Sequence, residues 1–191
     1  MLLELLKKTR TYRRFDRFKF ITDNDLAALV ESAGYVPSAG NLQRIRYITV
    51  GAKAALNLFS HISLGGYLPK EKKPDISVAP VAYIVMLTES DMPDINLSID
   101  VGISAEAIVL SAAEKGIGAC MVRNFDKDYF SSLVGDSGYS PVLVIALGYP
   151  DEEVKIIKAG VSDSLKYFKD ENGVNVVPKL PVESLILKSI E

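Results

Sequence analysis

Apolar residues recur along the chain with two spacings, one typical of helices and one typical of strands. Helical spacing predicts helices over residues 2–8, 22–34, 53–61, 99–115 and 126–134. Short apolar runs predict strands over residues 47–50, 81–87, 117–122, 141–147 and 174–177. Residues 81–87 and 141–147 form continuous apolar runs, which is typical of strands covered on both faces. The mixture predicts an α+β domain, and no internal repeat is visible.

Capping and turn residues mark where several of these elements begin and end. Thr22 and Asp25 stand three residues apart at the start of the second predicted helix, as in a capping box. The residues expected on the buried face of that helix share helical spacing and are Leu26, Leu29, Val30 and Ala33. Gly34 and Pro37 are expected to end it. The sequence Asp-Glu-Asn-Gly at 170–173 predicts a turn before the last strand.

Residues 99–115 form an unusually apolar predicted helix, with apolar or small residues on nearly every side. A small domain seldom covers a helix all round, so we expect it to pack against a second copy of the chain. Asp100 and Glu106 interrupt the apolar run, which falls short of the roughly 20 apolar residues of a membrane span. Residues 1–8 carry their charges after a very short apolar run, unlike a signal peptide. We therefore expect no membrane segment.

Composition narrows the class of protein. A chain of 191 residues suits one domain, residues 1–191. Its 22 basic and 24 acidic residues give a net charge of -2, which leaves no global positive field for nucleic acid or an anionic membrane. One cysteine excludes an intrachain disulfide, and one histidine with one cysteine does not make an ordinary zinc site, so no metal is expected. This cysteine usage fits a reducing cytoplasm best.

Two short segments carry the candidate chemistry, RTYRRF at residues 10–15 and PSAGNLQ at residues 37–43. In the first, Arg10, Thr11 and Arg13 supply two guanidinium groups and a hydroxyl, which match the oxygens of a phosphate monoester. The second lies between a predicted helix and a predicted strand. Its Ser38, Gly40, Asn41 and Gln43 offer neutral donors and acceptors on backbone that can come close to a ligand, which suits a sugar-alcohol chain and the edge of a flavin ring.

The two segments are similar to the Arg-Ser-x-Arg-x-Phe opening and the Pro-Ser-x-x-Asn-x-Gln segment of the FMN-dependent nitroreductase family. Three further segments follow in the family's order: residues 100–103 leading through 112–120 to Asn124 and Phe125, then residues 146–150, then residues 177–179. The resemblance covers roughly residues 9–187 and rests on all five segments together.

The resemblance implies a central, mostly antiparallel sheet flanked by helices, in an intertwined homodimer with FMN at the subunit interface. The segment from about residue 165 to residue 191 is expected to extend over the partner subunit. The implied activity transfers a hydride from NADH or NADPH to FMN and then reduces a small-molecule acceptor such as a nitroaromatic or a quinone. No catalytic side chain is implied. The implied cofactor-binding residues are Arg10, Thr11, Arg13, Ser38, Ala39, Asn41, Gln43, Val122, Arg123, Asn124 and Lys179.

Departures from the family pattern leave two alternatives open. Thr9 stands where the family often has an arginine, and Leu180 follows Lys179 where another arginine is frequent. The chain is therefore also compatible with a non-catalytic module that binds or senses flavin, or with a dimeric interaction protein that has lost FMN. The sequence leaves open the physiological acceptor, the preference between NADH and NADPH, and what covers the flavin.

Overall fold

An antiparallel sheet forms the centre of the protein in a computed structural model that describes residues 1–66, 68–69, 71, 73–89 and 94–190. Its four strands lie in the order β1-β2-β4-β3 and are β1 (Arg46–Val50), β2 (Ala82–Thr88), β3 (Gly118–Val122) and β4 (Ser140–Gly148). Every residue of β2 is buried, as predicted for a strand covered on both faces. The predicted antiparallel sheet is thus confirmed, and β3 is one of its two edge strands.

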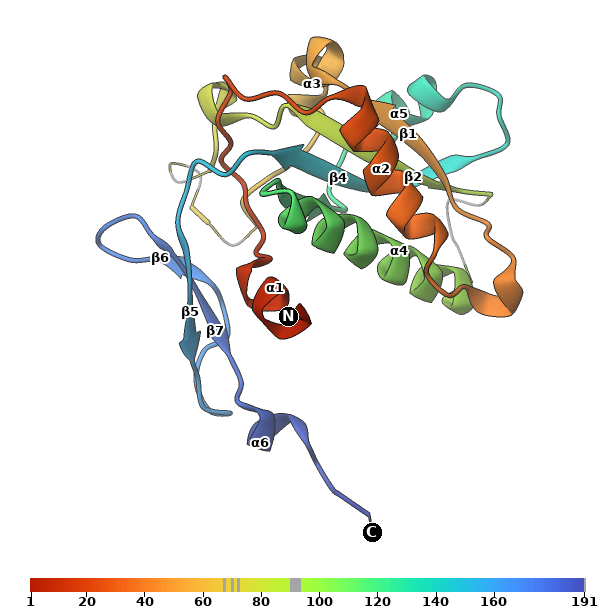
Figure 1. The fold of residues 1–191 in the computed structure, drawn as a ribbon. Coiled ribbons are helices and arrows are strands. Elements are labelled where there is room, and N and C mark those ends of the chain that lie inside the picture. The colour runs from red at the N-terminus through yellow and green to blue at the C-terminus, as the bar shows by residue number, and fades with distance from the viewer. Residues whose placement is uncertain (67, 70, 72, 90–93, 191) are drawn as a thin grey trace.

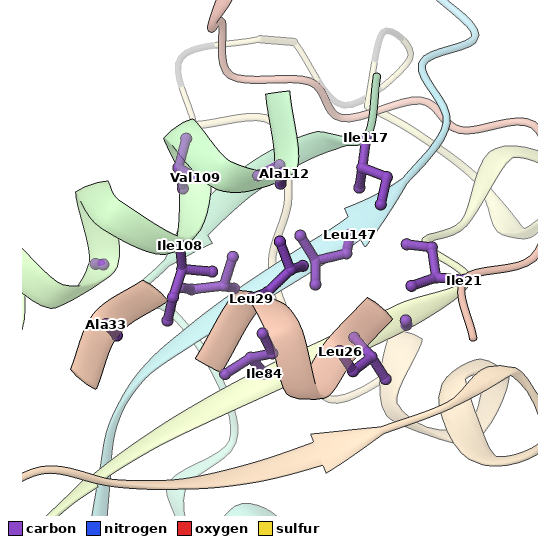
Figure 2. Packing of buried hydrophobic residues seen from close by; sticks show 14 of the residues in the cluster. Ile21, Leu26, Leu29, Ala33, Ile84, Ile108, Val109, Ala112, Ile117 and Leu147 are labelled. Atoms are coloured by element: carbon purple, nitrogen blue, oxygen red, sulfur yellow. The ribbon is translucent and has the colours of Figure 1, made fainter. Parts of the chain in front are cut away.

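Helices cover both faces of this sheet (Figure 1). On one face, α2 (Asp23–Gly34) and α4 (Ile95–Glu114) pack onto alternate residues of the strands, and Figure 2 shows Leu29 and Ile108 of these helices meeting Leu147 of β4. On the other face, α3 (Ala52–Phe59) and α5 (Lys127–Val134) enclose a second cluster around Tyr83 and Phe130. The alternation of strand residues between the two clusters explains why the central strands read as continuous apolar runs.

The capping box predicted at the start of α2 is present. The Thr22 hydroxyl oxygen accepts a hydrogen bond from the Asp25 N–H at 3.1 Å, and an Asp25 carboxylate oxygen accepts the Thr22 N–H at 3.3 Å. Leu26, Leu29 and Ala33 are buried as expected, whereas Val30 is only half-buried. The helix ends at Gly34, as predicted.

Two helix boundaries differ from the prediction by more than one residue. Helix α4 begins at Ile95, four residues before the predicted start, because the Asp94 carboxylate caps it by accepting the Leu97 N–H at 2.8 Å. Helix α3 ends at Phe59, and His61 already belongs to the following turn.

The C-terminal part forms an arm that reaches past the main sheet (Figure 1). It holds a three-stranded sheet of order β5-β7-β6, made of β5 (Val154–Lys158), β6 (Phe168–Lys169) and β7 (Asn175–Lys179), followed by α6 (Val182–Leu185). The predicted turn is present, since the Gly173 N–H donates to the Asp170 carbonyl at 3.0 Å. The sequence did not predict β5, which pairs in parallel with β7.

Helix α4 is longer than predicted and is only partly covered. Its 20 residues and mean hydropathy of 1.5 make it, by length and composition, the one helix among the described residues that could cross a membrane, a test that the core helix of a soluble protein also passes. Ala105, Ile108 and Ala112 are fully buried in the core. Ile95, Ile99 and Ile103, spaced one turn apart, are 76%, 54% and 38% exposed, so the chain alone leaves an apolar stripe on α4 uncovered.

Candidate functional site

The segment after α1 (Leu2–Lys8) lies along the free edge of β3. The Tyr12 N–H donates to the Ala119 carbonyl at 3.0 Å, and Thr11 forms a parallel bridge with Ala119. The Thr9 hydroxyl donates to the Leu5 carbonyl at 2.7 Å and closes the end of α1. Arg10 donates from one terminal nitrogen to a carbonyl of α1, while its Nε is buried without a hydrogen-bond partner among the described residues. Arg10 therefore has a donor left for a ligand.

A hollow of about 350 Å³ opens beside this segment, and we call it the phosphate-end hollow. Its lining residues are Thr9, Arg10, Thr11, Glu106, Val109, Ala119, Met121 and Lys179. It brings together Arg10, Thr11 and Lys179 from opposite ends of the chain, with Lys179 placed by β7. Guanidinium, hydroxyl and ammonium groups around one space are the donor set of a phosphate site. Glu106 is the one carboxylate in the lining among the described residues.

A second hollow of about 370 Å³ shares Met121 with the first, and we call it the strand-end hollow because it lies where β3 ends. Its lining residues are Ser98, Val101, Gly102, Met121, Arg123, Phe125, Lys127, Pro141, Val142 and Leu143. Met121 is 40% exposed, whereas Cys120 and Val122 on either side of it are buried in the second core cluster. Burial raises the pKa of the Cys120 thiol to about 11, so the thiol stays protonated at neutral pH.

The turn after α3 forms hydrogen bonds with the backbone that follows β3, including Asn124. The Ser63 N–H donates to the Asn124 carbonyl at 2.8 Å, and the Asp126 N–H donates to the His61 carbonyl at 2.8 Å. The His61 ring stacks on Tyr129 with centroids 3.5 Å apart, and its Nδ1 lies 3.0 Å from an Asp126 carboxylate oxygen. Hydrogen bonds from the Tyr129 N–H and from His61 lower the pKa of Asp126. These contacts hold the backbone at the end of β3 in one place.

The 38–43 segment lies at a different place, near the N-terminal half of α4. The Ala39 N–H donates to a carboxylate oxygen of buried Asp100 at 3.0 Å. Ser38 and Gln43 line their own hollow of about 200 Å³, together with Asp100. Val109 of the phosphate-end hollow lies nine positions further along α4 than Asp100, which is roughly 14 Å at the rise of an α-helix. The structure of one chain therefore does not bring Ser38, Ala39, Asn41 and Gln43 to Arg10 and Lys179.

Left-handed backbone shapes this segment. Gly40, Asn41 and Gln43 have φ angles of 59°, 54° and 49°, in a region that asparagine tolerates better than glutamine. The Gln43 N–H donates to the Ser38 hydroxyl at 3.3 Å, and the Gln43 side-chain amide donates to the Asn41 side-chain oxygen at 3.1 Å. Asn41 and Gln43 are exposed, so their polar groups face outward from a fixed loop.

Arg13 lies outside the phosphate-end hollow. Its guanidinium lies 4.5 Å from the centre of the Tyr167 ring, and the Tyr167 hydroxyl donates to the Gly65 carbonyl at 2.9 Å. The backbone N–H groups of Arg13 and Arg14 both donate to the Glu152 carboxylate, which also accepts from the Asn175 side chain. Glu152 thus ties the arginine segment to the C-terminal arm.

Comparison with known proteins shows the family of the chain. A family model described as Nitroreductase family matches residues 6–149. A curated protein of Streptococcus pyogenes serotype M6, named as a candidate NAD(P)H nitroreductase, is 26% identical over 182 residues, which cover 79% of this chain and 90% of that protein.

Solved structures agree with that match. An FMN-dependent nitroreductase from Clostridium difficile R20291 is 25% identical with a TM-score of 0.63, over 79% of this chain and 88% of that chain. A nitroreductase family protein from Streptococcus pneumoniae TIGR4 is 21% identical with a TM-score of 0.69, over 99% of this chain and 100% of that chain. The second likeness concerns the fold alone, and it includes the C-terminal arm.

Proposed function

This chain belongs to the nitroreductase family, and on that premise we propose that it is an FMN-dependent oxidoreductase that takes electrons from NADH or NADPH and reduces nitroaromatic, quinone or related acceptors. The observation that carries the proposal is the phosphate-end hollow, where Arg10, Thr11 and Lys179 converge and where Arg10 Nε is buried without a partner among the described residues. The names of the S. pyogenes and C. difficile relatives support the donor and the cofactor.

In this proposal the phosphate of FMN binds in the phosphate-end hollow. Arg10 and Lys179 supply two positive charges and Thr11 a hydroxyl. The carbonyl of Leu6 orients the Arg10 guanidinium before the ligand arrives, which reduces the conformational entropy lost on binding. Glu106 also lines the hollow, and its negative charge offsets part of the attraction of the two cations for an anion.

The flavin ring is proposed to lie along the edge of β3, from Met121 towards the backbone of Val122, Arg123 and Asn124. Bound FMN supplies the chemistry of accepting and donating a hydride. The chain holds and positions it: burial of Val122 and the hydrogen bond to the Asn124 carbonyl fix the backbone on both sides of Arg123. Arg13 is proposed to contact the flavin from its place beside the Tyr167 ring, and not from within the phosphate-end hollow.

We propose further that a second copy of the chain completes the site with its Ser38, Ala39, Asn41 and Gln43. The separation of these residues from the phosphate-end hollow within one chain supports this arrangement, as does the exposed stripe of Ile95, Ile99 and Ile103 on α4. Residues from about 165 to 191 are proposed to lie over that second copy. Exposed apolar side chains near the C-terminus support this, with Leu185, Leu187 and Ile190 exposed by 67%, 102% and 86%.

The absorption spectrum of the purified protein tests the proposal. The protein is incubated with FMN, freed of excess cofactor and titrated anaerobically with NADH and then with NADPH. Flavin bands that bleach with either donor are the expected result. Bands that stay coloured with both donors contradict the enzyme proposal and favour a binding or sensing module. Absence of bands contradicts the site and favours an interaction protein without FMN.

A further inference from the structure

The strand-end hollow is distinguished by its charge. Arg123 and Lys127 line it, and the lining contains no aspartate or glutamate among the described residues. Resting on the function proposed above, we infer that the electron acceptor carries an anionic group, such as a carboxylate, on an apolar or aromatic body. In this inference Arg123 and Lys127 select that anion.

The two cations are uncompensated. In the described part of the chain, neither the Arg123 guanidinium nor the Lys127 ammonium forms a hydrogen bond or an ion pair. Asp126 stands between them in sequence, but its carboxylate bonds His61 and the Tyr129 N–H instead. Two positive charges beside an apolar wall attract an anion more strongly than they would in open water, because the wall lowers the local dielectric constant.

The rest of the lining fits the apolar or aromatic part of the proposed acceptor. Val101, Phe125, Val142 and Leu143 give the hollow apolar walls, which suit an aromatic ring. Within a single chain the α4 side is open as well, since a Cβ added at Gly102 would meet no atom within 4 Å. A volume of about 370 Å³ is in the range of sites for small organic ligands.

The position of the hollow suits electron transfer. Met121 and Arg123 line the strand-end hollow and also border the place proposed for the flavin ring along β3, so the hollow lies beside that ring. An acceptor whose anionic group is held by Arg123 and Lys127 would therefore have its apolar body beside the flavin. The same two cations would disfavour acceptors with a positive charge.

The test uses para-nitrobenzoate and para-nitrobenzamide, which have nearly the same shape and differ in charge. The FMN-loaded protein is reduced with dithionite, and the rate of flavin reoxidation by each compound is measured by stopped flow in the parent, in Lys127→Gln and in Arg123→Gln. The ratio of the rate constants, benzoate over benzamide, is expected to fall about three- to fivefold in each variant, in the range for one exposed charge pair. Arg123→Lys, which keeps the charge, is expected to restore most of the ratio.

Two further arms make the result decisive. Lys53→Gln removes an exposed lysine of α3 that is not part of the lining, and should leave the ratio at the parent value. Calorimetry with each compound and the oxidised protein needs no turnover, and the Lys127→Gln variant should lose affinity for the benzoate alone.

A ratio that stays at the parent value in both hollow variants overturns the inference. A loss confined to the rate of reduction by NADH or NADPH also overturns it, because the cations would then recognise the donor's phosphates. Failure of NADH and NADPH to bleach the flavin contradicts the proposed function and leaves the dithionite and calorimetric arms to decide this inference.

Discussion

The phosphate-end hollow and the 38–43 segment both carry residues predicted to bind one cofactor, yet a single chain assembles only the first of them. Arg10, Thr11 and Lys179 meet because the arginine segment pairs with β3 and the C-terminal arm brings β7 to the same edge. The 38–43 segment is instead fixed to the N-terminal half of α4 through Asp100, and Arg44 next to it pairs with Asp94 at 3.2 Å. Within one chain the two groups of residues therefore lie apart along α4, and the proposal that two chains share each site accounts for this separation.

The largest expected effect comes from Arg10. Arg10→Gln removes a charge-assisted contact to the phosphate and should weaken FMN binding by about 1.5 to 3 kcal/mol, measured by quenching of FMN fluorescence. Arg13→Gln should cost less, because the Arg13 guanidinium lies over Tyr167 and outside the phosphate-end hollow. Unchanged affinity in both variants would refute the phosphate assignment, and a larger loss in Arg13→Gln would reverse the comparison between the two arginines.

Glu152 tests how the phosphate-end hollow is held together. Glu152→Ala leaves the N–H groups of Arg13 and Arg14 and the Asn175 amide without their shared acceptor, which should lower the free energy of unfolding by about 1 to 3 kcal/mol in urea denaturation. FMN affinity should fall with it, because the arginine segment loses its tie to the arm that carries Lys179. Glu153→Ala is the matched control, since the Glu153 side chain makes no hydrogen bond or ion pair in the described part of the chain. Equal stability losses in the two variants would show that Glu152 has no special role.

Asp94 tests the other region, with a smaller effect. Asp94→Ala removes the cap of α4 and the partner of Arg44, and should lower the free energy of unfolding by less than Glu152→Ala does. The Leu97 N–H and Arg44 lower the pKa of Asp94, so the contribution of this carboxylate is present at neutral pH and is lost as the pH falls through that lowered pKa.

Hydrogen exchange locates the effect of that substitution. Amides of residues 38–45 should exchange faster in Asp94→Ala, whereas those of residues 10–15 should keep the parent rates. Faster exchange in both segments would mean that the two regions are coupled within one chain, contrary to the comparison.

Local signals in the sequence predicted much of the fold. Thr22 and Asp25 place the start of α2, and the continuous apolar run at β2 places a central strand. The start of α4 was missed because Asn96 and Ser98 interrupt its apolar pattern just after the cap. Strand β5 was missed because Lys155 and Lys158 make it resemble a surface loop and its pairing partner β7 lies far along the chain.

For the candidate site, the sequence identified residue types better than positions. Arg10, Thr11 and Lys179 belong to segments that local motifs single out, and the structure brings them together. The place of Arg13 depends on Tyr167, and the role of Glu152 depends on Asn175 and on the arginine segment, so no local pattern identifies either. Contacts between residues far apart in sequence decide where these side chains lie, and local patterns in a single sequence do not predict those contacts.

The most direct test of two chains sharing each site is FMN binding by mixed dimers. One chain carries Arg10→Gln with Lys179→Gln, and the other, with a different affinity tag, carries Asn41→Ala with Gln43→Ala. After co-expression and purification through both tags, a mixed dimer should contain one intact site and bind one FMN, while either parent dimer binds far less. Mixed dimers that bind no more FMN than the parents would contradict the account, since every chain would then hold a complete site of its own.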